Sequence, residues 1–353
     1  MSWEEILQRP ASRWTQGDGP VNDVVISTRV RLARNLAKHP FPNWAEEKEM
    51  QAILNDVEHA VQQLSTREQF YFVNLTRLSA IDRQLLVEKH LTSIDHIRQP
   101  KYRAIVLRED EGVSIMVNEE DHLRIQSLFP GLQLEAAMQL ASNIDDQLEN
   151  VLDYAFDEMY GYLTTCPTNA GSGMRASLMV HLPGLVMLNQ AGRVFATLAQ
   201  LGLMARGLYG EGTEALGNIF QISNQITLGR SENELLANLA AVIGQLIEQE
   251  QAARKRLYQE MGNLLLDKIF RSLGTLTHAY LLSTKEAINL ISDLRLGLDL
   301  NLLPDLDYQV LNELLILCQP GFLQKVAGDQ ESIQKRDAKR AALLRERLKE
   351  IKN

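Results

Sequence analysis

Short runs of β-branched and apolar residues alternate with amphipathic stretches up to about residue 230. This alternation predicts strands at residues 24–28, 71–75, 104–107, 113–117, 175–182, 220–223 and 225–228. Two pairs of these runs, around Gly112 and around Asn224, are separated by a short turn and are predicted hairpins. Hairpins join antiparallel strands, so the pattern favours an α+β fold with a largely antiparallel sheet flanked by helices.

Apolar residues recur at helical spacing between the strands and throughout the rest of the chain. Residues 46–64 and 133–160 are predicted helices. Beyond residue 231 the strand signals stop, and an apolar stripe from Leu235 to Leu246 suits a helix packed on a partner helix, with packing in the core of the same chain favoured over an oligomer contact. The remainder is predicted to be helical, with a possible helix start at residues 283–286 and breaks at Gly262, Gly274, Gly297, Pro304 and Gly321.

The change from a mixed pattern to a helical one predicts two domains. Residues 1–253 would form the domain that contains the sheet, and residues 254–353 an all-α C-terminal domain. In the second domain the apolar run 311–318 would be core or a dimer face. Cys318, at its end, is predicted to be a buried small hydrophobe.

Composition and charge restrict the class of protein. Hydrophobic residues make up 45% of the 353 residues, and the formal net charge is −9, which argues against a nucleic-acid or anionic-membrane binder. The acidic N-terminus lacks the pattern of a signal peptide, and no apolar run could span a bilayer. With only two cysteines, no disulfide framework or cysteine zinc site is expected. These features predict a cytoplasmic protein.

Two segments combine charge with the end of a predicted strand. In Ser27-Thr28-Arg29-Val30-Arg31, strand geometry places the two arginines on the same side, where they repel unless an anion lies between them. In Asn118-Glu119-Glu120-Asp121-His122-Leu123-Arg124, three adjacent acids destabilise one another unless metal, guanidinium or water neutralises them. Each segment alone would also suit a solvated rim or turn.

Two further segments are rich in turn-forming residues. Pro167 pushes the preceding Cys166 toward an extended conformation, and a turn through Gly171 and Gly173 then leads to Arg175. The loop 206–214 contains three glycines and could close over a ligand while presenting Arg206 and Glu211, although an ordinary exposed loop would look the same. The letters G-S-G-M-R-A match a dinucleotide-binding pattern, but a strand follows them where that pattern requires a helix.

The four segments together indicate one site with two charge characters. A cage for a polyanion could be formed by Arg29, Arg31, Arg124, Arg175 and Arg206. A cationic partner could be received by Glu120, Glu211 and Cys166. This pairing suits transfer of a phosphoryl group from a nucleotide to a guanidino group.

In this order, S-T-R-V-R, N-E-E-D-H-L-R, C-P-T-N…R-A-S and R-G-x-x-G-E-x-T-E resemble the phosphagen (ATP:guanidino) kinase family over residues 24–250. The resemblance implies an ATP site made of Ser27, Thr28, Arg29, Val30, Arg31, His90, Arg124, Arg175, Ala176, Ser177, Leu178, Met179, Arg206, Gly207, Leu208, Tyr209, Gly210 and Glu211. His90 would lie by the base or ribose, with a surface helix histidine as the alternative. Met179 stands where many members have histidine, which leaves one nucleotide contact open.

The resemblance also implies a mechanism. We assign to Glu120 and Glu211 the binding of the planar guanidinium, the aiming of one nitrogen at the γ-phosphorus and the removal of its proton. Cys166, as thiolate, would orient the same group. The arginines and Mg²⁺ would offset charge on the transferring phosphoryl group of ATP.

The two ends of the chain depart from the small-molecule members of this family. Those members have an additional N-terminal helical domain, whereas about two dozen residues precede the first motif here. The predicted C-terminal domain ends in Arg336-Asp337-Ala338-Lys339-Arg340-Ala341. This layout resembles a bacterial branch that phosphorylates arginine side chains of proteins, and it implies a phosphoarginine-binding regulatory pocket at Arg336, Asp337, Arg340 and Ala341. A solvated charged helix remains the alternative.

The expected function is therefore that of a protein-arginine kinase whose product marks proteins for stress-response regulation and Clp-type degradation. A kinase for a free guanidino compound and a non-catalytic adaptor that binds nucleotide or phosphoarginine are the alternatives. The resemblance implies substrate proteins such as a heat-shock repressor, a zinc-binding activator protein, a Clp-type protease and a homodimer or higher oligomer as partners. No direct nucleic-acid or membrane partner is expected.

Overall fold

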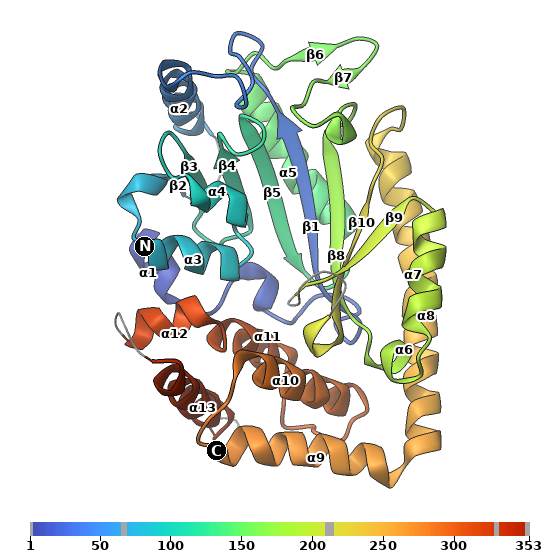
Figure 1. The fold of residues 1–353 in the computed structure, drawn as a ribbon. Coiled ribbons are helices and arrows are strands. Elements are labelled where there is room, and N and C mark those ends of the chain that lie inside the picture. The colour runs from blue at the N-terminus through green and yellow to red at the C-terminus, as the bar shows by residue number, and fades with distance from the viewer. Residues whose placement is uncertain (1–2, 65–68, 209–214, 328–331, 350–353) are drawn as a thin grey trace.

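A computed structural model describes residues 3–64, 69–208, 215–327 and 332–349 (Figure 1). Its centre is an eight-stranded sheet in the order β2-β3-β4-β5-β1-β8-β10-β9, with every neighbouring pair antiparallel. The strands are β1 (Val25–Arg34), β2 (Phe70–Asn74), β3 (Ala104–Arg108), β4 (Val113–Val117), β5 (Leu123–Pro130), β8 (Met174–His181), β9 (Leu203–Gly207) and β10 (Ile219–Asn224). A separate hairpin joins β6 (Phe156–Asp157) to β7 (Gly161–Tyr162). The predicted α+β class is confirmed.

Helices connect and cover these strands. Those of the first part are α1 (Trp3–Gln8), α2 (Glu47–Val61), α3 (Ala80–Glu88), α4 (Ile94–Arg98), α5 (Leu134–Glu149), α6 (Pro183–Met187), α7 (Ala191–Gln200) and α8 (Glu232–Met261). Single 3₁₀ turns lie at η1 (Arg13–Thr15), η2 (Leu75–Arg77), η3 (Pro167–Asn169) and η4 (Leu216–Asn218). The rest of the described chain forms α9 (Asn263–His278), α10 (Thr284–Asp299), α11 (Tyr308–Leu317), α12 (Pro320–Ala327) and α13 (Ile333–Lys349).

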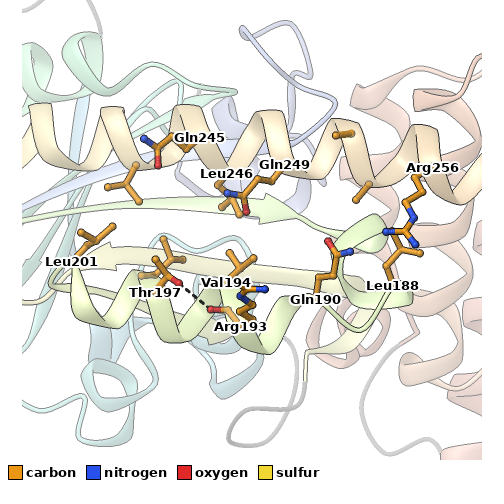
Figure 2. A pocket seen from close by; sticks show the side chains of 14 residues that line it. Leu188, Gln190, Arg193, Val194, Thr197, Leu201, Gln245, Leu246, Gln249 and Arg256 are labelled. Atoms are coloured by element: carbon orange, nitrogen blue, oxygen red, sulfur yellow. Dashed lines mark hydrogen bonds between the residues drawn. The ribbon is translucent and has the colours of Figure 1, made fainter.

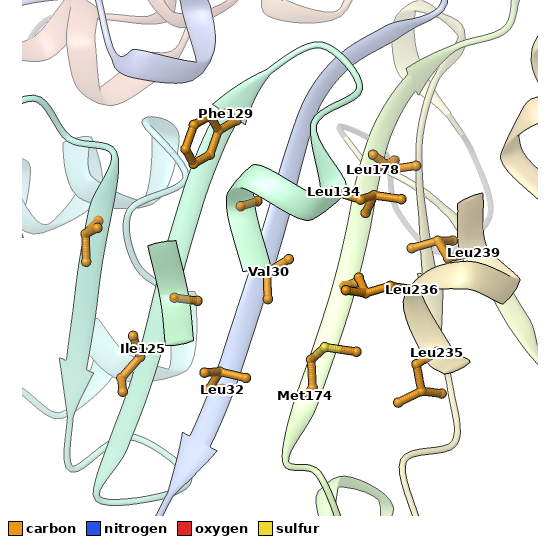
Figure 3. Close-up of a cluster of buried hydrophobic side chains, with 14 of the residues drawn as sticks. Val30, Leu32, Ile125, Phe129, Leu134, Met174, Leu178, Leu235, Leu236 and Leu239 are labelled. Carbon is orange, nitrogen blue, oxygen red and sulfur yellow. The ribbon is translucent and has the colours of Figure 1, made fainter. Parts of the chain in front are cut away.

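One face of the sheet is buried beneath α5 and α8. Figure 3 shows Val30 and Leu32 of β1 directed toward this layer, beside Met174 and Leu178 of β8. The predicted stripe from Leu235 to Leu246 on α8 is buried against the same layer, which confirms its place in the core. Because side chains alternate along a strand, Arg29 and Arg31 project from the opposite face.

The helices α9–α13 gather at the end of the sheet where β1 begins and β8 ends, below the sheet in Figure 1. They share a second core with the first part of the chain, in which Trp14 and Leu85 lie in one cluster with Leu311 and Phe322. The run 311–318 is therefore core, and Cys318 is fully buried, which raises the pKa of its thiol to about 12. Helix α8 continues through residue 253 without a break, so a domain boundary at that residue stays a prediction.

Some local predictions are confirmed and others are wrong. The hairpin of β3 and β4 forms, and Ser283 caps α10 by accepting from the Glu286 N–H at 3.2 Å. Residues 225–228 are not a strand, because the Asn224 side chain bonds back to β8 rather than opening a hairpin turn. Strand β9 and helix α7 were not predicted.

The predicted helix 133–160 ends at Glu149 instead. The chain beyond it pairs with the end of β1, where the Ala155 N–H donates to the Asn35 carbonyl at 2.7 Å, so a tertiary contact overrides the helical pattern. Gly274 and Gly297 lie inside α9 and α10 rather than at breaks, since one glycine costs a helix only about 1 kcal/mol. Gly262 does separate α8 from α9.

A buried histidine fixes the turn between β4 and β5, which carries Glu120. The His122 Nδ1 accepts from the Leu36 N–H at 2.9 Å, so Nε2 carries the proton and donates to the Pro40 carbonyl at 3.0 Å. Burial lowers the pKa of His122 to about 4, which keeps the ring neutral. Asn118 begins this turn with a φ of 59°, a left-handed conformation that asparagine tolerates.

We expect His122 to make stability depend on pH. The folded imidazole has a depressed pKa, so its contribution is complete above pH 6.5 and falls as acid protonates the unfolded chain. Between pH 7 and pH 5 this residue should account for a loss of about 2 kcal/mol in the free energy of unfolding. Urea unfolding of His122→Gln should show a correspondingly shallower pH dependence, whereas His278→Gln at an exposed position should match the wild type. Equal slopes for His122→Gln and the wild type would contradict this account.

Candidate active site

The five arginines predicted to form an anion cage lie on one face of the sheet. Arg124 is on β5, Arg29 and Arg31 on β1, Arg175 on β8 and Arg206 on β9. The register pairs Arg31 with Arg175, Ala33 with Arg124, and Arg206 with Gln221. Residues paired directly across strands point to the same side, so all five arginines project away from α5. We call this side of the sheet the arginine face.

Most of these arginines have no acidic partner. Within the described chain, no carboxylate forms an ion pair with Arg29, Arg31, Arg175 or Arg206. Arg29 donates to Ser177 Oγ at 3.3 Å and to Gln221 Oε1 at 3.0 Å. The Nε atoms of Arg31 and Arg175 are buried without a hydrogen-bond partner. A polyphosphate would supply these missing acceptors, so the residues present fit the phosphates of a nucleotide.

Besides lacking acceptors at the Nε atoms of Arg31 and Arg175, the arginines of this face repel one another. Burial, followed by the charges of Arg124 and Arg175, lowers the pKa of Arg29 to about 10. Burial and the same neighbours, together with Arg29, lower the pKa of Arg31 even further below its ordinary value. Both shifts mean that the charged forms are destabilised in the ligand-free protein. An anion on the arginine face would relieve that cost.

Arg124 differs because it has an acidic partner that the sequence did not single out. Glu119 lies 2.5 Å from Arg124, and Glu120 lies 3.7 Å from it. Burial acts to raise the pKa of Glu119, but the pull of Arg124 and a hydrogen bond from Ser93 lower it overall. The cation required by the run of three acids is thus an arginine of the same segment.

Glu120 and Cys166 lie at one end of the arginine face. The loop after Cys166 reaches Glu120, where Asn169 Nδ2 donates to Glu120 Oε2 at 3.4 Å. Cys166 has an extended backbone (φ −97°, ψ 121°), as the following proline predicts, and its Sγ lies 3.0 Å from Thr168 Oγ1. Burial raises the pKa of the Glu120 carboxyl despite the opposing charge of Arg124. A carboxylate and a thiol are thereby placed beside Arg124 and Arg175.

Buried polar contacts hold this loop in place. Asp121 Oδ1 accepts from Asn35 Nδ2 and from the Thr165 N–H, each at 2.7 Å. Arg34 forms an ion pair with Asp145 at 2.6 Å and also donates to the Ser172 carbonyl at 3.1 Å. Gly173 adopts a φ of +65°, and a Cβ there would lie 2.6 Å from the Ala33 carbonyl oxygen, so only glycine fits.

A small pocket lies at the other end of the arginine face. It is lined by Trp14, Ser27, Arg29, His90, Leu128, Ser177, Met179, Leu208 and Gln221. The rings of Trp14 and His90 meet edge to face with centroids 5.2 Å apart. Burial lowers the pKa of His90 to about 3, so its ring is neutral. Aromatic and aliphatic side chains next to arginines offer the chemistry that a nucleobase with adjoining phosphates requires, while the cavity itself is only about 20 Å³, so a base would lie at its mouth.

The structure divides the predicted ATP-binding residues. It brings Ser27, His90, Ser177, Met179 and Leu208 together in the pocket. The buried side chains of Thr28, Val30, Ala176 and Leu178 belong to the opposite, core face, so they shape the strands rather than line the site. Gly207 ends β9, whereas Tyr209, Gly210 and Glu211 lie outside the described residues. Trp14, Leu128 and Gln221 were missed because each lies in a segment without a local motif.

The C-terminal motif lies on α13, far from the residues of this site in the sequence. Arg340 is buried and donates to the Cys318 carbonyl at 2.8 Å and the Leu282 carbonyl at 2.6 Å. It also pairs with Asp337 on the same helix. Ala341 is fully buried, while Arg336 and Asp337 are partly exposed. Arg340 therefore organises the helix packing, and Arg336 is the more accessible guanidinium.

A separate groove of about 620 Å³ runs between α7 and α8 (Figure 2). Apolar residues such as Val194 and Leu246 line its centre, and Arg193 and Arg256 lie along it. None of the predicted site residues lines this groove. The chemistry indicated by the sequence is thus confined to the arginine face and to α13.

Two family models match the chain. Residues 52–253 match ATP:guanido phosphotransferase, C-terminal catalytic domain, and residues 262–353 match Protein-arginine kinase McsB C-terminal domain. The chain is 50% identical to the protein-arginine kinase of Symbiobacterium thermophilum over 353 residues, which cover 99% of each chain. It is also 50% identical to the protein-arginine kinase of Desulforamulus reducens over 356 residues, which cover 100% of both.

Solved structures of guanidino kinases share the fold. The duplicated taurocyamine kinase of Schistosoma mansoni, with bound transition-state-analogue components, matches with a TM-score of 0.61 and 28% identity, covering 70% of this chain and 35% of that chain. Lombricine kinase matches with a TM-score of 0.58 and 27% identity, covering 67% of this chain and 68% of that chain. From the matched catalytic model and the relatives that align over its whole length, the chain belongs to the ATP:guanido phosphotransferase family.

Proposed function

We propose that the protein transfers the γ-phosphoryl group of ATP to arginine side chains of proteins. The observation that carries the proposal is the arginine face, on which every arginine except Arg124 lacks an ion-pair partner within the described chain, and which ends at Glu120 and Cys166. Relatives that are about half identical over the whole chain are named protein-arginine kinases, which supports a protein as the acceptor. An anion site that adjoins a cation site is the arrangement that phosphoryl transfer to a guanidinium requires.

ATP would lie with its base against the pocket lined by His90 and Met179, and with its phosphates along β1 and β8. The orphaned Nε atoms of Arg31 and Arg175 would then gain acceptors, and the repulsion among the arginines would be offset. Charge on the transferring group would be stabilised by guanidinium groups already fixed by strand register. Such prior positioning and electrostatics supply most of the catalysis in phosphoryl transfer.

The acceptor arginine would enter at Glu120 and Cys166. A protonated guanidinium is a poor nucleophile, so its nitrogen must lose a proton as the N–P bond forms and the bond from the γ-phosphorus to the β-phosphate oxygen breaks. We assign that proton to Glu120, whose raised pKa makes it a better base than an ordinary carboxylate. Cys166 would orient the guanidinium, and Glu211, outside the described residues, would be the second carboxylate.

We assign Mg²⁺ to the nucleotide rather than to a protein cage. The described residues contain no cluster of three histidine, cysteine, aspartate or glutamate side chains able to hold a metal. Mg²⁺ commonly binds substrate phosphates and keeps several waters, so it would enter with ATP. When bound, it would neutralise part of the phosphate charge.

We further propose that phosphoarginine binds at α13 through Arg336 and Asp337, with Arg340 and Ala341 forming the packed base of that pocket.

Residues 1–253 and 254–353 would be the catalytic and regulatory domains. Family resemblance supports a homo-oligomer in the cytoplasm that acts with a heat-shock repressor, a zinc-binding activator and a Clp-type protease. Within the described residues, none of the helices has both the length and the apolar character needed to cross a membrane.

Two other functions remain to be distinguished. The names of taurocyamine kinase and lombricine kinase denote enzymes for small guanidino compounds, so a free acceptor is the first alternative. The second is a nucleotide- or phosphoarginine-binding adaptor without catalysis. The presence of Glu120 and Cys166 beside the arginine face argues against the adaptor.

Incubation with γ-labelled ATP, with either an arginine-rich protein or free arginine, should separate these functions. We expect acid-labile label on the protein, because a phosphorus–nitrogen bond forms on its arginines. Label on free arginine alone would favour the small-compound kinase, and binding without any transfer would favour the adaptor. Either of these results would contradict the proposal.

Replacing Glu120 should remove the base but leave nucleotide binding intact. Glu120→Gln keeps the size of the side chain, and we expect kcat to fall about 10²–10⁴-fold with little change in the KM for ATP. Steady-state kinetics of this variant and of Glu135→Gln, an exposed control on α5, would check it. A Glu120→Gln enzyme with wild-type kcat would exclude Glu120 as the base.

Two arginines of β1 should respond in opposite ways to loss of charge. Arg31→Met relieves repulsion, so the ligand-free protein should melt at the wild-type temperature or above it, but ATP should no longer raise its Tm strongly. Arg34→Met leaves Asp145 buried and unpaired, which should cost on the order of 3–5 kcal/mol of stability. Thermal unfolding with and without ATP measures both effects. Undiminished stabilisation of Arg31→Met by ATP would contradict the phosphate site.

A further inference from the structure

The carboxylate of Glu88 joins the sheet-containing part of the chain to the C-terminal helices. Glu88 lies in the last turn of α3 and is buried. Its Oε1 accepts from the Gly321 N–H at 2.7 Å, and its Oε2 accepts from the Phe322 N–H at 2.9 Å. Both N–H groups belong to the first turn of α12, so the carboxylate also lies at the positive end of that helix's dipole.

The residues that follow Glu88 build the walls of the nucleotide pocket. His90 ends α3 in a left-handed conformation (φ 61°), and its N–H donates to the Val87 carbonyl at 2.9 Å. The Lys89 carbonyl accepts from Trp14 Nε1 at 3.0 Å. The positions of both rings therefore depend on the backbone that follows Glu88: Trp14 binds the Lys89 carbonyl, and His90 is the next residue. A shift in the last turn of α3 would move the two rings that line the pocket.

On its other side, the joint is connected to the motif on α13. Arg340 holds the Cys318 carbonyl at 2.8 Å, and Cys318 lies three residues before Gly321. Arg340 also pairs with Asp337 of the proposed phosphoarginine pocket. Continuous contacts thus lead from α13, through the start of α12 and Glu88, to His90 and Trp14. Coupling between two sites requires such a set of contacts or an equivalent shared element.

The close approach of Glu88 depends on glycine at position 321. A Cβ on Gly321 would lie 2.8 Å from both Glu88 carboxylate oxygens and 2.8 Å from Gln84 Cγ. The same kind of joint occurs at α6, where Glu250 accepts from the Gly184 and Leu185 N–H groups at 2.9 Å each. In both helices the glycine follows a proline, so the helix opens with N–H groups accessible to a carboxylate.

We propose that Glu88 is a positioning residue of the nucleotide pocket, through which α12 and α13 set the affinity for the base and ribose of ATP. This assignment rests on the nucleotide site proposed above. Glu88 acts through His90 and Trp14 and does not reach the arginine face, where the side chains that would hold phosphates belong to strands. Its loss should therefore weaken contacts to the nucleoside while sparing contacts to the polyphosphate.

Calorimetric titration with ATP and with inorganic tripolyphosphate tests this distinction. In Glu88→Gln and in Gly321→Ala, which displaces the same carboxylate, we expect ATP to bind roughly tenfold more weakly. Tripolyphosphate should bind with wild-type affinity, and kcat at saturating ATP should change little. Gly274→Ala, where a Cβ has no close neighbour, and Asp82→Asn, which weakens a partly exposed α3–α12 ion pair with Lys325, are the controls.

Two results would overturn the assignment of Glu88. Unchanged ATP affinity in both variants would show that the joint does not position the pocket. Equal weakening of ATP and tripolyphosphate in variants that remain folded would show general loosening instead. If the wild-type protein bound neither ligand, the proposed nucleotide site would itself fail, and this assignment would fail with it.

Discussion

The repulsion among guanidinium groups on the arginine face is the constraint on which the rest of the structure depends. Antiparallel register fixes Arg31 opposite Arg175, and no carboxylate of the described chain forms an ion pair with either. Arginine cannot escape this cost by deprotonating near neutral pH, even with the pKa of Arg29 lowered to about 10. The core beneath the sheet, where Val30 alternates with these arginines, must hold them together until an anion arrives.

This constraint gives each end of the face a distinct chemical character. At one end Trp14 and His90 offer neutral aromatic walls, and burial keeps the His90 ring uncharged beside Arg29. At the other end, Glu120 and Cys166 can receive a cation. A nucleotide and a guanidinium have opposite charge requirements, which we propose are met at the two ends of the arginine face. Phosphoryl transfer needs no further chemistry from the protein than this alignment and a base.

Local rules of the sequence predicted part of this arrangement. Strand alternation placed Arg29 and Arg31 on one side, and Pro167 predicted the extended backbone at Cys166. Local rules could not bring Arg124 and Arg175 beside β1, because β5, β1 and β8 are neighbours in the sheet but distant in sequence. Their grouping was inferred from the charge character of the four segments, and the family resemblance supported it.

Tertiary contacts account for what was missed or wrong. Trp14 belongs to the pocket only because its indole reaches the Lys89 carbonyl, which no local pattern encodes. The false hairpin at Asn224 failed because that side chain pairs with β8. No local pattern singles out Glu88, because only the fold places the start of α12 against it.

A crystal structure of the protein with a non-hydrolysable ATP analogue and an arginine-containing peptide would test the central claim most directly. The account predicts phosphate oxygens within hydrogen-bonding distance of the Nε atoms of Arg31 and Arg175, with the peptide guanidinium at Glu120 and Cys166. An analogue bound elsewhere, such as in the groove between α7 and α8, with the arginine face empty, would contradict it.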